Sequence, residues 1–141
     1  MSKYTFEQLF KYLKNNSFEG EEWRFYDNPS IQENSVAVSN YARAFSFIDG
    51  HFLKDQGENN DYMYWYLNPY GETAVTCPIH KAVAECFCKK PQVKTRLVVD
   101  HIDGDKHNNL ASNLRWVTYK ENSNAQDVQK RKAASLKKTV E

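Results

Sequence analysis

The order of short segments between Arg96 and Gln126 limits the possible fold more than any other part of the sequence. Leu97–Val99 is an apolar segment typical of a β-strand, and Asp100 and His101 follow it directly. Ile102–Asp105 then supplies residues that favour a tight turn. This half of the stretch is therefore predicted to be a strand that ends in two polar side chains.

The other half of the stretch adds a second strand and a helix. An asparagine-rich loop leads to a predicted strand at Leu114–Val117. Thr118 and Glu121 have the spacing of a capping box, which predicts that a helix begins at about Tyr119. Asn122 then lies in the first two turns of that helix. The predicted order is strand, loop, strand, helix.

These elements bring a carboxylate, an imidazole and two amides close together. Side chains alternate along a strand, but the alternation relaxes at its end, so Asp100 and His101 can approach one site. Asn113 and Asn122 can reach the same place from the loop and the helix. Carboxylate and amide oxygens suit Mg²⁺, which shares phosphate oxygens with a substrate. A neutral histidine can take a proton from water that attacks phosphorus. From the residues alone, Asp100 and His101 fit a turn as well as a site, and Asn113 can equally cap local backbone.

Upstream, the sequence predicts a helix followed by a β-rich segment. Thr5 and Gln8 have capping-box spacing, and the apolar residues after them recur on one helical face. Strands are predicted over Trp23–Tyr26, Ala37–Phe47 and Tyr62–Tyr66. A second helix is predicted to start at Pro78 and to run to about Cys88.

Charge is distributed unevenly along the chain. Residues 1–75 carry 6 basic and 11 acidic side chains, a net of −5, whereas residues 76–141 carry 13 and 7, a net of +6. The overall net charge of +1 is the sum of these opposed parts. Such an asymmetry suggests a polyanionic partner for the second part.

Several protein classes are not favoured by the sequence. The three cysteines are odd in number and include no C-x-x-C pair, so neither a disulfide framework nor a structural zinc site is expected. No apolar run approaches the roughly 20 residues that a bilayer span needs. The start of the chain lacks the pattern of a signal peptide. We therefore expect a soluble cytoplasmic protein with no membrane partner.

Six segments, in their order along the chain, resemble the HNH nuclease family in its subgroup of phage and intron endonucleases. They are Val38–Arg43, Ile79–Phe87, Val99–Gly104, Asn108–Asn109, Asn113–Thr118 and Lys120–Asn122. Together they extend the resemblance from about residue 21 to residue 126. One departure is Ala42, because the corresponding upstream hairpin of the family usually has glycine there.

The resemblance implies a ββα-metal site that hydrolyses one DNA strand per active site. It implies that Asp100 and Asn122 bind one divalent metal together with the scissile phosphate, with Asn124 as an alternative to Asn122. His101 would be the general base for water, and Asn113 would orient His101 through a hydrogen bond. Mg²⁺ is the expected ion and Mn²⁺ is the alternative.

The resemblance also gives the basic residues a partner, double-stranded DNA. Residues expected to neutralise phosphates are Arg115, Lys120, Lys130, Arg131 and Lys132. Asn40 and Arg43 in the upstream hairpin are candidates for reading base edges, because a two-stranded ribbon fits the major groove. A phage-infected bacterium is the expected setting.

The expected fold is α+β and divides into three parts. Residues 1–75 are predicted to form a short helix and a small antiparallel β-rich module that reads DNA, residues 76–126 the ββα-metal nuclease module, and residues 127–141 a helical basic tail. The expected function is site-specific DNA cleavage by a homing-type endonuclease. The alternative is a catalytically silent DNA-binding regulator that kept the fold. Nicking or double-strand cleavage, and a monomer or a homodimer, stay open.

Overall fold

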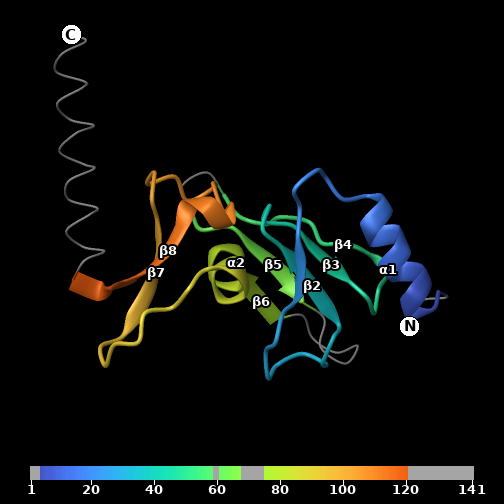
Figure 1. Cartoon of the computed structure of the whole chain (residues 1–141), viewed down its shortest axis with the longest axis horizontal. Coiled ribbons are helices and arrows are strands. Elements are labelled where there is room, and N and C mark those ends of the chain that lie inside the picture. Colours follow the sequence, from blue (N-terminus) through green and yellow to red (C-terminus); the bar gives the residue numbers. More distant parts are fainter. Residues whose placement is uncertain (1–3, 59–60, 68–74, 121–141) are drawn as a thin grey trace, which may run out of the picture.

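The computed structural model describes residues 4–58, 61–67 and 75–120, which form two α-helices and three antiparallel sheets (Figure 1). In chain order the elements are α1 (Phe6–Asn15), β1 (Trp23–Phe25), β2 (Val36–Ser39), β3 (Ala44–Ser46), β4 (His51–Phe52), β5 (Tyr64–Leu67), β6 (Val75–Pro78), α2 (Ile79–Phe87), β7 (Leu97–His101), the 3₁₀ turn η2 (Ala111–Asn113) and β8 (Leu114–Thr118). The fold is therefore α+β, as predicted.

Helix α1 begins at the predicted capping box. The Thr5 hydroxyl accepts a hydrogen bond from the Gln8 N–H, and the Gln8 side chain accepts one from the Thr5 N–H. Leu9 and Leu13 are buried on one face of the helix and pack against the four-stranded sheet. The amphipathic pattern of the sequence thus places α1 against the sheet.

The four-stranded sheet has the order β1-β2-β3-β4 and corrects one prediction. Ala37–Phe47 is not a single strand, because a turn divides it into β2 and β3. The Ser39 hydroxyl accepts hydrogen bonds from the N–H groups of Tyr41 and Arg43, which closes this turn. Ala42 lies in it with φ +61°, a left-handed conformation that favours glycine. This backbone conformation is one that the glycine expected from the resemblance would adopt without strain.

Helix α2 is the centre of the molecule. It contacts β2 of the first sheet, both strands of the β5–β6 hairpin and both strands of the β7–β8 hairpin (Figure 1). One hydrophobic core joins these elements, with Trp65, Ile79 and Val83 fully buried in it. The predicted boundary at residues 75 and 76 falls within the β5–β6 hairpin, so the two predicted modules share this core.

The β7–β8 hairpin confirms the strand–loop–strand part of the prediction. Its register places Asp100 opposite Arg115 and His101 opposite Leu114. Helical backbone begins at Tyr119, as the capping box predicts, and the described residues end at Lys120. Within the described residues, no helix is both long and apolar enough to span a bilayer.

Candidate functional site

His101 lies at the end of β7 and is only 6% exposed. Its Nε2 is 2.7 Å from Oδ1 of Asn109, in the loop between β7 and η2. An amide oxygen can only accept, so Nε2 carries the proton of this hydrogen bond. In the neutral imidazole the lone pair is therefore on Nδ1. This is the tautomer that a histidine needs to accept a proton at Nδ1.

Asn113 has a different set of contacts from the predicted one. Its Oδ1 accepts from the Asp103 N–H at 3.1 Å, and its Nδ2 donates to Asp103 Oδ1 at 2.9 Å and to the Asn108 carbonyl at 2.8 Å. Among the hydrogen bonds of the described residues, none joins Asn113 to the ring of His101. Asn113 therefore does not orient His101 through a direct hydrogen bond. Its side chain binds the loop at Asp103 and Asn108, and the side chain of Asn109 binds the imidazole.

Asp103 is the turn residue that the sequence predicts, and it anchors the same loop. Its carboxylate accepts hydrogen bonds from Asn108, Asn113 and the Asp105 N–H. The Asn108 side chain, followed by the Asp105 N–H, lowers the pKa of Asp103. An ionised Asp103 therefore stabilises the loop that carries Asn109 to His101.

Asp100 precedes His101 and forms an ion pair across the hairpin. Arg115 Nε donates to Asp100 Oδ2 at 2.9 Å, with the carboxylate side chain 7% exposed and the arginine side chain 48% exposed. The register explains the pair, because these two residues are direct partners in the β7–β8 ladder. Arg115, predicted to bind phosphate, thus lies at the predicted metal ligand and keeps an exposed surface beside it.

Two further rings surround His101. Tyr62, just before β5, stacks on His101 with ring centroids 5.8 Å apart, and His80 of α2 lies 5.2 Å from it. The sequence predicts no role at the site for Tyr62, His80 or Asn109. The asparagine pair at Asn108 and Asn109 was the available signal for Asn109. The contacts of Tyr62 and His80 depend on how three separate elements pack.

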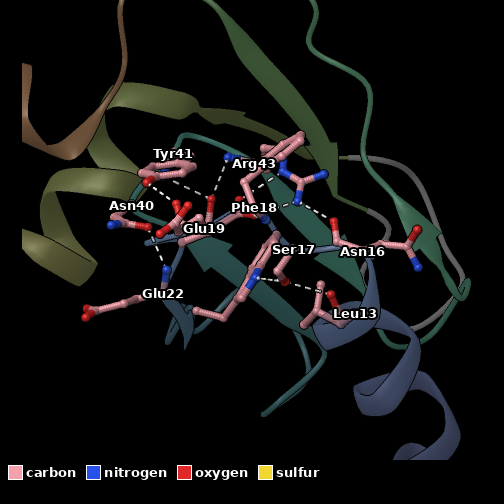
Figure 2. Close-up of polar contacts among 12 residues, drawn as sticks. Leu13, Asn16, Ser17, Phe18, Glu19, Glu22, Asn40, Tyr41 and Arg43 are labelled. Atoms are coloured by element: carbon pink, nitrogen blue, oxygen red, sulfur yellow. Dashed lines mark hydrogen bonds and ion pairs between the residues drawn. The ribbon is translucent and has the colours of Figure 1, made fainter.

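Asn40, predicted to read DNA bases, is engaged within the protein (Figure 2). Its Oδ1 accepts from the Glu22 N–H at 2.7 Å and its Nδ2 donates to the Gly20 carbonyl at 3.1 Å. Its backbone carbonyl accepts from the Ala111 N–H at 2.9 Å, which ties the β2–β3 turn to η2. The predicted role for Asn40 thus competes with a structural one.

Arg43 is engaged in the same way. Its guanidinium donates to both carboxylate oxygens of Glu21, at 2.6 and 2.9 Å, and to the Asn16 carbonyl at 2.9 Å. It also lies over the rings of Phe18 and Phe52. Burial raises the pKa of Glu21, but hydrogen bonds from Arg43 and from the Phe18 N–H outweigh it, so the pKa is lowered overall.

The remaining predicted residues lie at or beyond the end of the described chain. Lys120 is exposed in the first helical turn after β8. Asn122, Asn124, Lys130, Arg131 and Lys132 lie outside the described residues. Within the described ranges, no three His, Cys, Asp or Glu side chains gather closely enough to form a metal site by themselves. Cys77, Cys86 and Cys88 are free cysteines.

The donors present suit a cation that takes few protein ligands. Asp100 supplies one buried carboxylate, and its pair with Arg115 occupies one oxygen, which leaves acceptor capacity for a cation. Mg²⁺ is usually held by one or two carboxylates, with waters and substrate phosphates completing its shell. Asp100, as a single buried carboxylate, fits this pattern of few protein ligands.

A β-hairpin whose first strand ends in Asp-His, followed by the start of a helix, is the arrangement of a ββα nuclease site. Residues 89–124 match the family described as HNH endonuclease. The chain therefore carries an HNH endonuclease domain.

Curated relatives agree with this domain. The chain is 41% identical over 90 residues to DNA endonuclease I-HmuI of Bacillus phage SP01, an alignment that covers 64% of this chain and 50% of the phage protein. It is 38% identical over 85 residues to an HNH endonuclease of Acanthamoeba polyphaga mimivirus, covering 60% of this chain and 21% of that protein. The chain thus spans half or less of the length of these relatives.

A solved structure extends the likeness beyond the domain. The structure described as DNA binding and cleavage by the HNH homing endonuclease I-HmuI superposes with a TM-score of 0.67 at 36% identity. The alignment covers 83% of this chain and 66% of the other. The likeness therefore includes segments upstream of residues 89–124.

Proposed function

We propose that this chain is a metal-dependent, site-specific DNA endonuclease of the homing type that hydrolyses phosphodiester bonds. The observation that carries the proposal is the pair at the end of β7. His101 has its Nε2 committed to Asn109, which leaves Nδ1 as the proton acceptor, and the buried carboxylate of Asp100 is its neighbour in the chain. The phage relative, a DNA endonuclease, supports DNA as the substrate.

In the proposed reaction, each described residue has one task. His101 accepts a proton at Nδ1 from the water that attacks phosphorus. Asn109 keeps the imidazole in the required tautomer, and Asn113 with Asp103 holds the loop that carries Asn109. The exposed part of Arg115 and the ammonium of Lys120 are available to DNA phosphates next to the site.

Asp100 and Asn122 would hold the divalent ion, with Mg²⁺ the expected ion, Mn²⁺ the alternative, and Asn124 the alternative amide ligand. When bound, such an ion supplies positive charge to the phosphate oxygens and to the leaving oxygen. Lys130, Arg131 and Lys132 would add phosphate contacts along duplex DNA. The setting that we propose is the cytoplasm of a phage-infected bacterium.

The decisive experiment incubates the protein with a phage genome in the presence of Mg²⁺ and maps the ends that form. We expect cuts at defined positions, and the ends will distinguish a nick from a double-strand break. His101→Ala should lower the cleavage rate at least a hundredfold, because general-base catalysis contributes roughly 10²–10⁴. His51→Ala is the matched control, since His51 is an exposed histidine in β4.

Binding separates the endonuclease from the alternative, a silent DNA-binding regulator. His101→Ala should bind duplex DNA as the wild-type protein does. If the wild-type protein binds a specific site but releases no new ends with Mg²⁺ or Mn²⁺, the regulator is correct. If His101→Ala cuts at the wild-type rate, the assignment of the general base is wrong.

A further inference from the structure

Three aromatic rings from three separate segments of the chain meet at the proposed general base. Tyr62 and His80 stack with centroids 4.7 Å apart and planes 28° apart. Tyr62 and His101 stack at 5.8 Å and 27°, and His80 contacts His101 at 5.2 Å. Each ring therefore touches the other two. Only His101 belongs to residues 89–124, because Tyr62 precedes β5 and His80 is in α2.

Histidine is an unusual residue at a buried position whose side chain only has to fill space in the core. Its Nδ1 is buried and has no hydrogen-bond partner within the part of the chain that the structure describes. An unpaired buried nitrogen costs stability, and a hydrocarbon side chain of similar size would avoid that cost. Burial, with the neighbouring His101 and Lys81, lowers the pKa of His80 to about 4, so the ring that contacts His101 is neutral near pH 7.

Tyr62 is equally unlike a core residue. It is 42% exposed, its ring stacks on His101, and the Nζ of Lys106 is 4.8 Å from the ring centroid. One face of an exposed tyrosine thus contacts a loop lysine while the ring also stacks on both histidines. Two polar aromatic side chains, Tyr62 and His80, therefore contact the His101 ring.

A single hydrogen bond does not fix the plane of an imidazole. The Nε2–Oδ1 bond to Asn109 sets which nitrogen carries the proton, but one hydrogen bond at one ring atom still lets small changes in the side-chain torsions tilt the ring. Contacts on the ring itself remove this freedom. We propose that Tyr62 and His80 are positioning residues of the cleavage reaction, which hold the plane of the His101 imidazole while Asn109 holds its tautomer. This inference rests on the proposed function.

The test compares substitutions that keep an aromatic ring with substitutions that replace the ring by an aliphatic side chain. For each position we compare Phe with Leu, that is His80→Phe with His80→Leu and Tyr62→Phe with Tyr62→Leu. Single-turnover cleavage at saturating protein, the Kd for duplex DNA and the Tm are measured for each variant. We expect the Phe variants to cleave within about threefold of wild type. We expect the Leu variants to be about ten- to a hundredfold slower, because misplacement by about 1 Å can cost 10² in rate.

A purely structural role would give another result. Leucine fills most of the space that phenylalanine fills, so a structural role predicts that the Phe and Leu variants at each position have similar cleavage rates and Tm values. Equal rates for the Phe and Leu variants would therefore overturn the proposal, whether both are fast or both are slow. A rise in the Kd for DNA that accounts for the whole loss would also overturn it.

A readout without DNA separates this inference from the proposed function. In ¹H–¹³C NMR spectra of the histidine rings, the His101 signals should shift in Tyr62→Leu and stay near their wild-type positions in Tyr62→Phe, because the aromatic ring current is kept. Unchanged signals in Tyr62→Leu would show that Tyr62 does not hold His101. If the wild-type protein fails to cleave DNA, the proposed function is refuted, and the NMR comparison still decides whether the Tyr62 ring packs on His101 in solution.

Discussion

Arg43→Ala is expected to lower the free energy of unfolding by about 3 kcal/mol. Arg43 makes two hydrogen bonds to the Glu21 carboxylate and one to the carbonyl of Asn16, the C-cap residue directly after α1 (Figure 2). Its guanidinium also lies 4.4 Å from the ring centroid of Phe18 and 4.6 Å from that of Phe52. Truncation removes all of these contacts together.

The magnitude follows from what is left behind. The Glu21 side chain is 0% exposed, so truncation leaves its carboxylate buried without its cation. Breaking a buried ion pair from one side costs about 3–5 kcal/mol. We take the lower end because the Arg43 side chain is 27% exposed, so that water can enter the space it leaves. The lost contacts with Phe18 and Phe52 act in the same direction.

Urea unfolding at pH 7 measures the effect, with Lys11→Ala on the exposed side of α1 as the control. Glu21→Gln in the Arg43→Ala background should recover part of the loss, because it removes the unpaired charge. In acid, below the ordinary pKa of a glutamate, the difference between Arg43→Ala and wild type should shrink, because the unpaired Glu21 is then protonated. If Arg43→Ala unfolds within about 0.5 kcal/mol of wild type but binds DNA weakly, Arg43 serves the DNA and our reasoning is refuted.

Three further predictions follow from single contacts. Asn109→Ala should slow cleavage about ten- to a hundredfold without changing the Kd for DNA, because His101 loses the acceptor that sets its tautomer; a normal rate would contradict this role. Ala42→Gly should raise the free energy of unfolding by about 0.5–1 kcal/mol. Alanine in the left-handed conformation is strained by roughly 1–2 kcal/mol, and removing this strain outweighs the conformational entropy that glycine loses on folding. Urea unfolding measures the change. His80, whose pKa falls from 6.5 unfolded to about 4 folded, binds protons more readily in the unfolded chain, so stability should fall by about 1–2 kcal/mol from pH 6.5 to pH 5. Measured as Tm against pH, that part of the acid sensitivity should be absent in His80→Phe.

The parts of the site that the sequence could predict are local. Asp100 and His101 end an apolar strand, and the turn chemistry of Asp103 follows at once, so their placement depends on neighbours in the chain. The hydrogen-bond partner of the His101 ring was predicted as Asn113, but in the structure the Asn109 side chain makes this bond. Both asparagines lie in one loop, and the path of that loop is determined by the bonds of Asn113 to Asp103 and Asn108. No local pattern specifies such a path.

The apolar periodicity of the sequence could not predict contacts between distant segments. The turn after Ser39 uses neither glycine nor proline, so the apolar alternation of Ala37–Phe47 predicted one continuous strand. Tyr62 and His80 meet His101 only because α2 packs against both the β5–β6 and the β7–β8 hairpins. Periodicity predicted α2 itself, but not which side chains it would present to the site.

The upstream hairpin illustrates how a resemblance can locate a segment and still leave its task open. Asn40 and Arg43 were expected to face DNA bases, yet their side-chain groups bind Gly20, Glu22, Glu21 and Asn16 of the same chain. The Asn40 carbonyl also accepts a hydrogen bond from the N–H of Ala111, a residue that directly follows the loop carrying Asn109 to His101. These bonds connect α1 and the first sheet to η2, which precedes β8 of the β7–β8 hairpin. Substitutions at Asn40 or Arg43 should therefore lower the cleavage rate by destabilising the fold. Side chains that read the DNA sequence are expected among those whose polar groups are not engaged in hydrogen bonds within the protein.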